Sequence, residues 1–323
     1  MIALRRIGDE FLKRREASIL LVAIALMAYF QATTGIFFTE SNIVNVSQYV
    51  AATAIIAAGQ VLLLVSGEID LSVGNVYTLA PFLMHYAVDF WGVPVIPSIL
   101  LALVLSALIG LVNGFITVVL RVPSFVTTLG MLFLISGITL ITSNAYPVPI
   151  PTAADAFAPW LGAAPWAEII WALLIIAVLH AVLTSTRWGL HTIAVGGNLL
   201  GASEAGIRVG RIKIGNFMIC SALGGFAGII EAFRIDSIDP TAGGTGIMFA
   251  AVASAVIGGT ALAGGSGTII GALLGAVVLG VLRDGFNLIG VDAYTFDLII
   301  GAAILLAMIS NVHLARLRRA GRT

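Results

Sequence analysis

Two carboxylates and a hydroxyl stand together at the end of an apolar stretch. Residues 67–74 read Gly-Glu-Ile-Asp-Leu-Ser-Val-Gly and follow the apolar run 49–65. A charged side chain inside a bilayer is costly and usually faces a partner or a water-filled cavity. On a regular helix Glu68 and Asp70 would point in different directions, whereas an interrupted backbone could turn both toward one cavity. Glu68, Asp70 and Ser72 therefore contact a substrate or shape its gate, or Asp70 or Ser72 caps a helix that begins near Val73.

A second group of charges lies near residue 235. Glu231 and Arg234 are three residues apart and can pair on one helix face, and Asp236 and Asp239 follow. Carboxylates and arginine can bond the hydroxyls of a neutral sugar, so Arg234 and Asp239 are candidates for a substrate pathway. A surface ion pair is the alternative. Two amides at membrane depth, Asn75 and Asn113, could also line a pathway.

Several kinds of chemistry have no support in the sequence. Cys220 is the single cysteine, and the four histidines show no metal-ligand spacing, so we assign no metal ligand and no catalytic residue. The glycine-rich run 258–268 lacks the Gly-Lys-Ser/Thr of a phosphate loop and predicts a tight structural turn. Net charge is zero, which gives no indication of a nucleic-acid partner. We expect this chain to bind no cofactor itself.

The elements that position these residues are membrane-spanning helices. The 323 residues are 59% hydrophobic and 10% charged, against about 25% charged in a soluble domain, and apolar stretches near 20 residues recur along the chain. The sequence predicts an all-α polytopic membrane protein formed by a single transmembrane domain, 1–323. The ten expected spans are 17–38, 47–65, 75–91, 96–119, 124–142, 167–185, 214–232, 246–263, 268–286 and 294–311.

The basic residues predict the orientation of these spans. With the N-terminus inside, 14 of the 16 lysines and arginines fall in cytoplasmic segments, as the positive-inside rule expects. Both termini are then cytoplasmic, with tails at 1–16 and 312–323. Residues 143–166 form an extracytoplasmic loop with a short helix near residues 153–161, and residues 186–213 form a cytoplasmic loop.

An internal repeat is indicated at an offset of 171 residues. Gly114-Phe115 aligns with Gly285-Phe286, Gly130 aligns with Gly301, and residues 67–74 fall on the polar loop 238–245. Equivalent helices lie an odd number of spans apart in the order along the chain, so the halves would be inverted. Inverted repeats and interrupted helices are common around transporter substrate sites, although glycine-rich helices can also match by chance.

The cytoplasmic loop has the features of a docking element. Small residues bound a short segment that could present a rigid knob to a partner, although an ordinary basic loop would also obey the positive-inside rule. The residues that we expect to couple to such a partner are Gly196, Gly197, Asn198, Ala202, Glu204 and Gly206.

Several segments together resemble a known family over residues 45–311. They are residues 67–74, Arg121-Val122-Pro123 with Thr128-Leu129-Gly130, residues 194–198 and the run 258–267. The chain resembles the permease subunits of ribose/xylose/galactose-type ABC importers. Two positions depart from the family pattern: Glu68 replaces a more usual glycine, and Glu204 replaces an apolar residue.

The resemblance implies a complete transport system. A cytoplasmic ABC ATPase, duplicated in sequence, would hold ATP and magnesium, and the region 186–213 would form the coupling helix that docks on it. A periplasmic sugar-binding protein would deliver the cargo, and a second copy or a paralogue would complete a dimer in the lipid of the bacterial inner membrane. The subunit would perform no bond chemistry.

Two other functions remain open. Autoinducer-2 importers share the motifs, so the cargo is not fixed by them. A secondary transporter driven by protons is a different class, in which Glu68, Asp70 or Asp297 would carry the proton. Uptake that persists without ATP but collapses with the proton gradient would identify it.

Overall fold

The computed structural model describes residues 15–292, 295, 298–299, 301–302 and 305. Its elements are α2 (Arg15–Thr34), α3 (Glu40–Val65), α4 (Val73–Asp89), α5 (Val95–Val118), α6 (Ser124–Ser143), β1 (Val148–Pro149), η1 (Thr152–Ala154), η2 (Pro159–Ala163), α7 (Ala167–Ser185), α8 (Arg187–Gly197), α9 (Leu199–Glu204), α10 (Val209–Ile235), β2 (Ser237–Ile238), α11 (Thr245–Ile257) and α12 (Ile269–Leu288). The all-α class is confirmed. The tenth expected span, 294–311, and the tail 312–323 lie outside the described residues, as does nearly all of the tail 1–16.

Seven of the described helices are long and apolar enough to cross a membrane. They are α2, α3, α5, α6, α7, α10 and α12. The other two expected spans are shorter: α4 has 17 residues and α11 has 13. Helix α11 ends six residues before the expected position, because the chain turns at Gly259, Gly264 and Gly265, all with positive φ angles that favour glycine.

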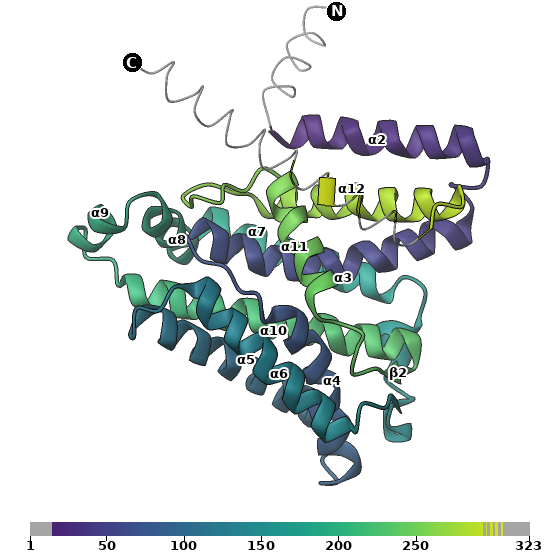
Figure 1. The fold of residues 1–323 in the computed structure, drawn as a ribbon, viewed down its shortest axis with the longest axis horizontal. Coiled ribbons are helices and arrows are strands. Elements are labelled where there is room, and N and C mark those ends of the chain that lie inside the picture. Colours follow the sequence, from purple (N-terminus) through teal and green to yellow (C-terminus); the bar gives the residue numbers. More distant parts are fainter. Residues whose placement is uncertain (1–14, 293–294, 296–297, 300, 303–304, 306–323) are drawn as a thin grey trace, which may run out of the picture.

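The helices form layers around α3. Helices α2, α12 and α3 run side by side, and α10, α5 and α6 form a second layer with α4 beneath it (Figure 1). Helix α3 also contacts α7, α10 and α11, and its side chains from Val50 to Val65 are buried. Small residues permit this enclosure: a Cβ atom added at Gly59 would lie 2.9 Å from the Cα of Cys220 in α10.

The helix bounds follow the repeat predicted at 171 residues. Shifted by that number, α3 falls on 211–236, α4 on 244–260 and α5 on 266–289, each within three residues of the ends of α10, α11 and α12. The packing is reciprocal, because α3 contacts α11 and α12 while α10 contacts α4 and α5. The first turns of the short helices α4 and α11 meet at the centre, where the amide of Gly244 donates to the carbonyl of Gly74 at 2.9 Å.

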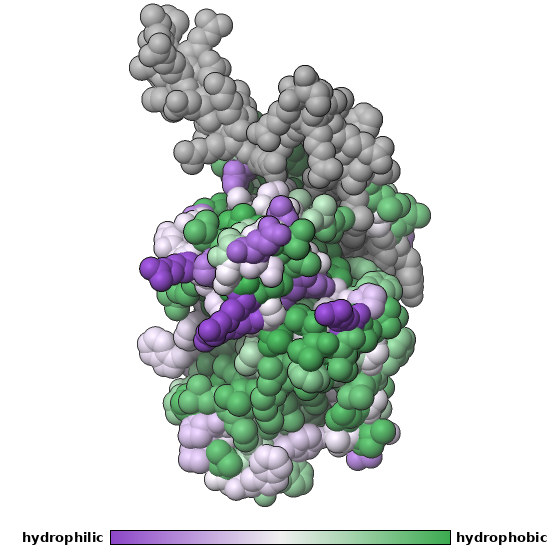
Figure 2. Space-filling view, turned by 90° about the vertical axis from the view of Figure 1, so that its left-hand side faces the viewer, coloured by the Kyte–Doolittle hydropathy of each residue, from purple (hydrophilic) through white to green (hydrophobic). Residues whose placement is uncertain are grey.

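The two ends of the molecule differ. One end, which we call the α9 face, carries α8 and α9; the opposite end, the β face, carries the antiparallel pair β1–β2, in which Val148 lies opposite Ile238 (Figure 1). On the α9 face hydrophilic residues gather in a band next to large apolar areas (Figure 2). The single helix expected near residues 153–161 is wrong: two short turns, η1 and η2, replace it, because Pro159 cannot continue a helix from η1.

Candidate functional site

Asp70 lies at the centre of a buried hydrogen-bond network. Its Oδ1 accepts from the backbone N and the Oγ of Ser72, at 2.8 and 2.6 Å, and from Nδ2 of Asn113 in α5 at 3.5 Å. Its Oδ2 accepts from Oγ of Ser221 in α10 at 3.2 Å, and Nε2 of Gln60 in α3 donates to its carbonyl. The side chain has no exposed surface. This arrangement ties three helices together beneath the start of α4 and favours the structural interpretation of Asp70.

Ser72 and Asn113 belong to the same network. Ser72 occupies the N-cap position of α4, but its hydroxyl makes no cap bond and donates to Asp70 instead. Asn113 also donates to Oγ of Ser72 at 2.9 Å. Both side chains are buried within this network.

Glu68 forms an ion pair that links the two halves of the repeat. Its Oε1 lies 2.6 Å from Nζ of Lys213 in α10, and the two side chains are only 13% and 14% exposed. Sequence reasoning missed Lys213. Its rarity was a usable signal, because the chain has only two lysines. The ion pair holds the α3–α4 connection against the first turns of α10.

A cavity of about 190 Å³, lined by uncharged residues, lies where α4, α6 and the α10–α11 connection meet. Its lining residues are Asn75, Thr78, Ser136, Thr139, Leu140, Pro240, Thr241 and Gly244. Asn75 is the one predicted pathway residue among them. Sequence reasoning missed the hydroxyls of α6, although Ser136 and Thr139 are three residues apart on one face of an apolar span, and that pattern was visible.

Asp239 and Arg234 lie outside that lining. Asp239 accepts from the N and the Oγ1 of Thr241, both at 2.7 Å, and so shapes the turn beside the cavity. The guanidinium of Arg234 pairs with Glu231 in its own helix, with Nε 2.8 Å from Oε2, and lies 3.5 Å from the carboxylate of Glu168 in α7.

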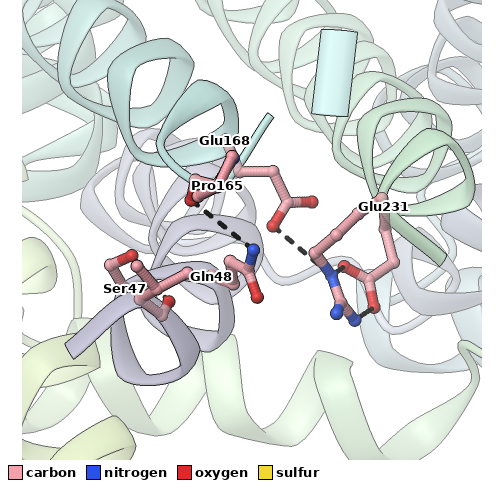
Figure 3. Close-up of polar contacts among 7 residues, drawn as sticks. Ser47, Gln48, Pro165, Glu168 and Glu231 are labelled. Atoms are coloured by element: carbon pink, nitrogen blue, oxygen red, sulfur yellow. Dashed lines mark hydrogen bonds and ion pairs between the residues drawn. The ribbon is translucent and has the colours of Figure 1, made fainter. Parts of the chain in front are cut away.

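The environment of Arg234 is an acidic cluster between helices. The carboxyl groups of Glu168 and Glu231 extend into the same space between α7 and α10, and Gln48 of α3 reaches the carbonyl of Pro165 beside them (Figure 3). Glu168 is fully buried, and among the described residues its oxygens accept no hydrogen bond. Since Arg234 faces two carboxylates, the cluster fastens α7 to α10. Glu168 was also missed by sequence reasoning.

Helices α8 and α9 form a compact hairpin on the α9 face. Asn198 caps α9, because its Oδ1 accepts from the amide of Gly201 at 2.9 Å. Ala202 is buried and packs with Val195 and Ile212, so it seats α9 on the hairpin and is not presented outward. The outward side chains of α9 include Leu199, Leu200 and Glu204, with Leu200 70% exposed. Gly206 ends the hairpin with a φ of +81°.

A junction made of backbone joins this hairpin to both halves of the fold. The amide of Gly265, in the turn between α11 and α12, donates to the carbonyl of Val65 at the end of α3, at 2.8 Å. Gly196 of α8 lies against the same carbonyl so closely that a Cβ atom would overlap it. Gly197 also packs on Gly265, but a Cβ atom added to Gly197 would be 3.9 Å from the Cα of Gly265, which is an ordinary contact. Three distant segments are therefore in direct contact at this glycine junction.

Other chemistry is not indicated by the described residues. Among them, no three His, Cys, Asp or Glu side chains gather as a metal site, and Cys220 is buried. The arrangement can bind a neutral polar molecule and can transmit movement, and it defines a polytopic helical membrane protein with interrupted helices.

Comparison with known proteins identifies the family. Residues 42–308 match the family described as the permease component of the branched-chain amino acid transport system. The chain is 38% identical to the xylose/arabinose import permease protein XylH of Sulfolobus acidocaldarius, over 94% of this chain and 86% of that protein. It is 37% identical to the ribose import permease protein RbsC of Escherichia coli K12, over 91% and 92%.

A third relative is named for a different cargo. The chain is 32% identical to the autoinducer 2 import system permease protein LsrC of Photorhabdus luminescens, over 91% of this chain and 89% of that protein. The comparison with solved structures finds none that matches. Because these matches cover most of the chain, it belongs to this permease family. Together with the seven long apolar helices, they make it a multi-pass membrane protein.

Proposed function

We propose that this chain is the permease subunit of an ATP-driven importer that carries a monosaccharide or related polyol across the plasma (inner) membrane. Relatives named for xylose, arabinose and ribose support the cargo class, and the uncharged lining of the cavity suits a neutral polyol. A periplasmic binding protein delivers the cargo, and a second permease copy or a paralogue completes the translocating unit.

The observation that carries this proposal is the connection of α9 to the glycine junction. Helix α9 presents exposed Leu199 and Leu200, which suit an apolar groove on a partner. Its hairpin contacts the end of α3 through Gly196 and the α11–α12 turn through Gly265. A displacement imposed on α9 by an ATPase would therefore reach both halves of the repeat, and the ATP would be held and hydrolysed by that ATPase.

The orientation follows from the charge distribution. The segments at the α9 face carry exposed Arg121, Arg187, Arg208 and Arg211, and the positive-inside rule puts such a face in the cytoplasm. The β face is then periplasmic, and both termini are cytoplasmic.

A proton-driven secondary transporter is less well supported. A proton carrier must exchange protons with water on one side and then on the other. Asp70 is fully enclosed and accepts bonds from Ser72, Asn113 and Ser221, and Glu68 is occupied by Lys213. Asp297 lies outside the described residues. An autoinducer-2 cargo remains the alternative within the importer class.

The test is transport by the reconstituted complex. The chain, copurified with its ATPase, is placed in proteoliposomes, and uptake of ribose and xylose is measured with the loaded binding protein. We expect uptake to require ATP and to fall about tenfold or more in Leu200→Asp, because an exposed apolar anchor would be lost from the contact. Leu120→Asp, an exposed leucine outside the hairpin, is the control. Uptake that ignores ATP and follows a proton gradient would refute the proposal.

A further inference from the structure

The cavity between α4, α6 and the α10–α11 connection is the strongest unassigned feature of the molecule. Its polar lining comes from three separate segments: Asn75 and Thr78 of α4, Ser136 and Thr139 of α6, and Thr241 before α11. Among its described lining residues none is charged. We propose that this cavity is the surface on which the permease holds its sugar during passage, an inference that rests on the proposed function.

The lining offers hydrogen-bond acceptors. The hydroxyls of Thr78 and Thr139 donate to the carbonyls of Gly74 and Ile135 in their own helices, at 3.2 and 2.9 Å. The hydroxyl of Thr241 donates to Asp239. A hydroxyl that already donates can still accept, so these groups suit a ligand that brings its own O–H donors.

Asn75 adds an oriented acceptor. Its Nδ2 donates to the carbonyl of Leu132 in α6 at 2.7 Å, which fixes the amide plane. Its Oδ1 lies toward Gly244 on the cavity lining, because a Cβ atom at that glycine would be 3.7 Å away. The oxygen is therefore available to a sugar hydroxyl.

The same lining argues against an amino acid as cargo. A zwitterion would need partners for a carboxylate and an ammonium group. The described lining offers no charged side chain for either group. The cavity therefore distinguishes a polyol from the cargo in the family's description.

The cavity is closed toward the α9 face. The Asp70 network lies beneath the start of α4, and the pair Glu68–Lys213 closes the connection before it. Exposed Leu140 and Thr241 lie on its lining at the accessible side. The two short helices begin beside it, so it occupies the point where both repeats are interrupted.

Helix α6 has one polar face and one apolar face, which makes the proposal testable. Ser136, Thr139 and Leu140 line the cavity, whereas Leu134, Ile138 and Ile141 are exposed on the opposite side. If the cavity belongs to the aqueous pathway, the first face meets water, and the second meets lipid or the second permease copy.

The first experiment compares Ser136→Cys with Ile138→Cys in the complete complex in membranes. Cys220 is the sole native cysteine and is fully buried, so wild type gives the background. The probe is a charged methanethiosulfonate reagent, which reacts with the thiolate. We expect at least about tenfold faster labelling of Ser136→Cys, because thiolate forms in water and not in lipid. Equal labelling, or faster labelling of Ile138→Cys, would overturn the proposal.

The second experiment blocks the cavity. Leu140→Trp places a large ring at its wall, and Ile141→Trp places the same ring on the opposite, 78% exposed face. We expect Leu140→Trp to lower ribose and xylose uptake about tenfold or more, while ATPase activity is retained. Ile141→Trp should leave uptake unchanged. Unchanged uptake by a monodisperse Leu140→Trp complex overturns the cavity assignment alone. If wild type imports neither sugar with ATP, the proposed function fails, and this inference fails with it.

Discussion

Replacing Gly196 by alanine tests the glycine junction directly. A Cβ atom at this position would overlap the carbonyl oxygen of Val65 and would come 2.7 Å from the amide nitrogen of Gly265. Both neighbours are backbone atoms, so no side chain can rotate away to make room. Either the end of α8 moves away from α3, or the Gly265–Val65 hydrogen bond at 2.8 Å is lost.

The stability lost in Gly196→Ala can be estimated from three contributions. Overpacking of a closed contact costs about 1–3 kcal/mol. A lost backbone hydrogen bond costs about 1 kcal/mol more. Alanine is favoured over glycine inside a helix by roughly 1 kcal/mol, which offsets part of this. We expect Gly196→Ala to lose about 1–3 kcal/mol of stability.

Gly197→Ala is the matched control. Its Cβ atom would meet only the Cα of Gly265, at the ordinary distance of 3.9 Å, so the helix preference remains and stability is unchanged or slightly higher. Thermal unfolding in detergent is followed by reaction of the buried Cys220 with a fluorogenic maleimide. The midpoint of Gly196→Ala should lie several degrees below that of Gly197→Ala. Equal midpoints would refute the close backbone contact.

Three further predictions use the same unfolding measurement. Asp70→Asn should lower the stability by about 1–3 kcal/mol, because an amide group would face hydrogen-bond donors in a buried site. Asp239→Asn should be nearly neutral, because asparagine makes the same turn. Equal effects of the two substitutions would contradict the buried network. Lys213→Met should cost about 2 kcal/mol by leaving Glu68 unpaired, less than the 3–5 of a fully buried pair, and adding Glu68→Gln should restore part of the loss; no restoration would argue against the pair. Arg234→Met should cost about 2 kcal/mol, because two glutamates would face each other unneutralised, and a melting curve like that of wild type would disprove the cluster's role.

The helices could be predicted because hydropathy and charge distribution depend on residues that are close together in the sequence. Nine of the ten expected spans coincide with described helices, and the sparse matches at an offset of 171 residues anticipated the alignment of α3, α4 and α5 with α10, α11 and α12. The end of α11 could not be placed, because a window over an alanine-rich and glycine-rich stretch stays apolar across the turn at Gly258–Gly259.

The site was harder to predict because it depends on which helix faces meet. Asp70 was found, but its enclosure depends on Asn113 and Ser221, which are distant in sequence. Ser136 and Thr139 share one face of an apolar span, and Thr139 bonds its own helix, but only the position of α4 gives them a cavity. Glu168 was missed because an ion pair between helices has no local pattern, and for Lys213 the rarity of lysine was the only signal.

The enclosure of α3 has a consequence for biosynthesis. Helix α3 emerges from the ribosome early, yet the helices that surround it, α7, α10, α11 and α12, begin at residue 167 or later. Until they are inserted, Gln60 and the other buried side chains of α3 must face lipid or the insertion machinery. The centre of the protein therefore assembles last, in a step that joins segments far apart in the chain and is slow for that reason. A chain truncated before α10 should be membrane-inserted yet unfinished, and so a target for quality control.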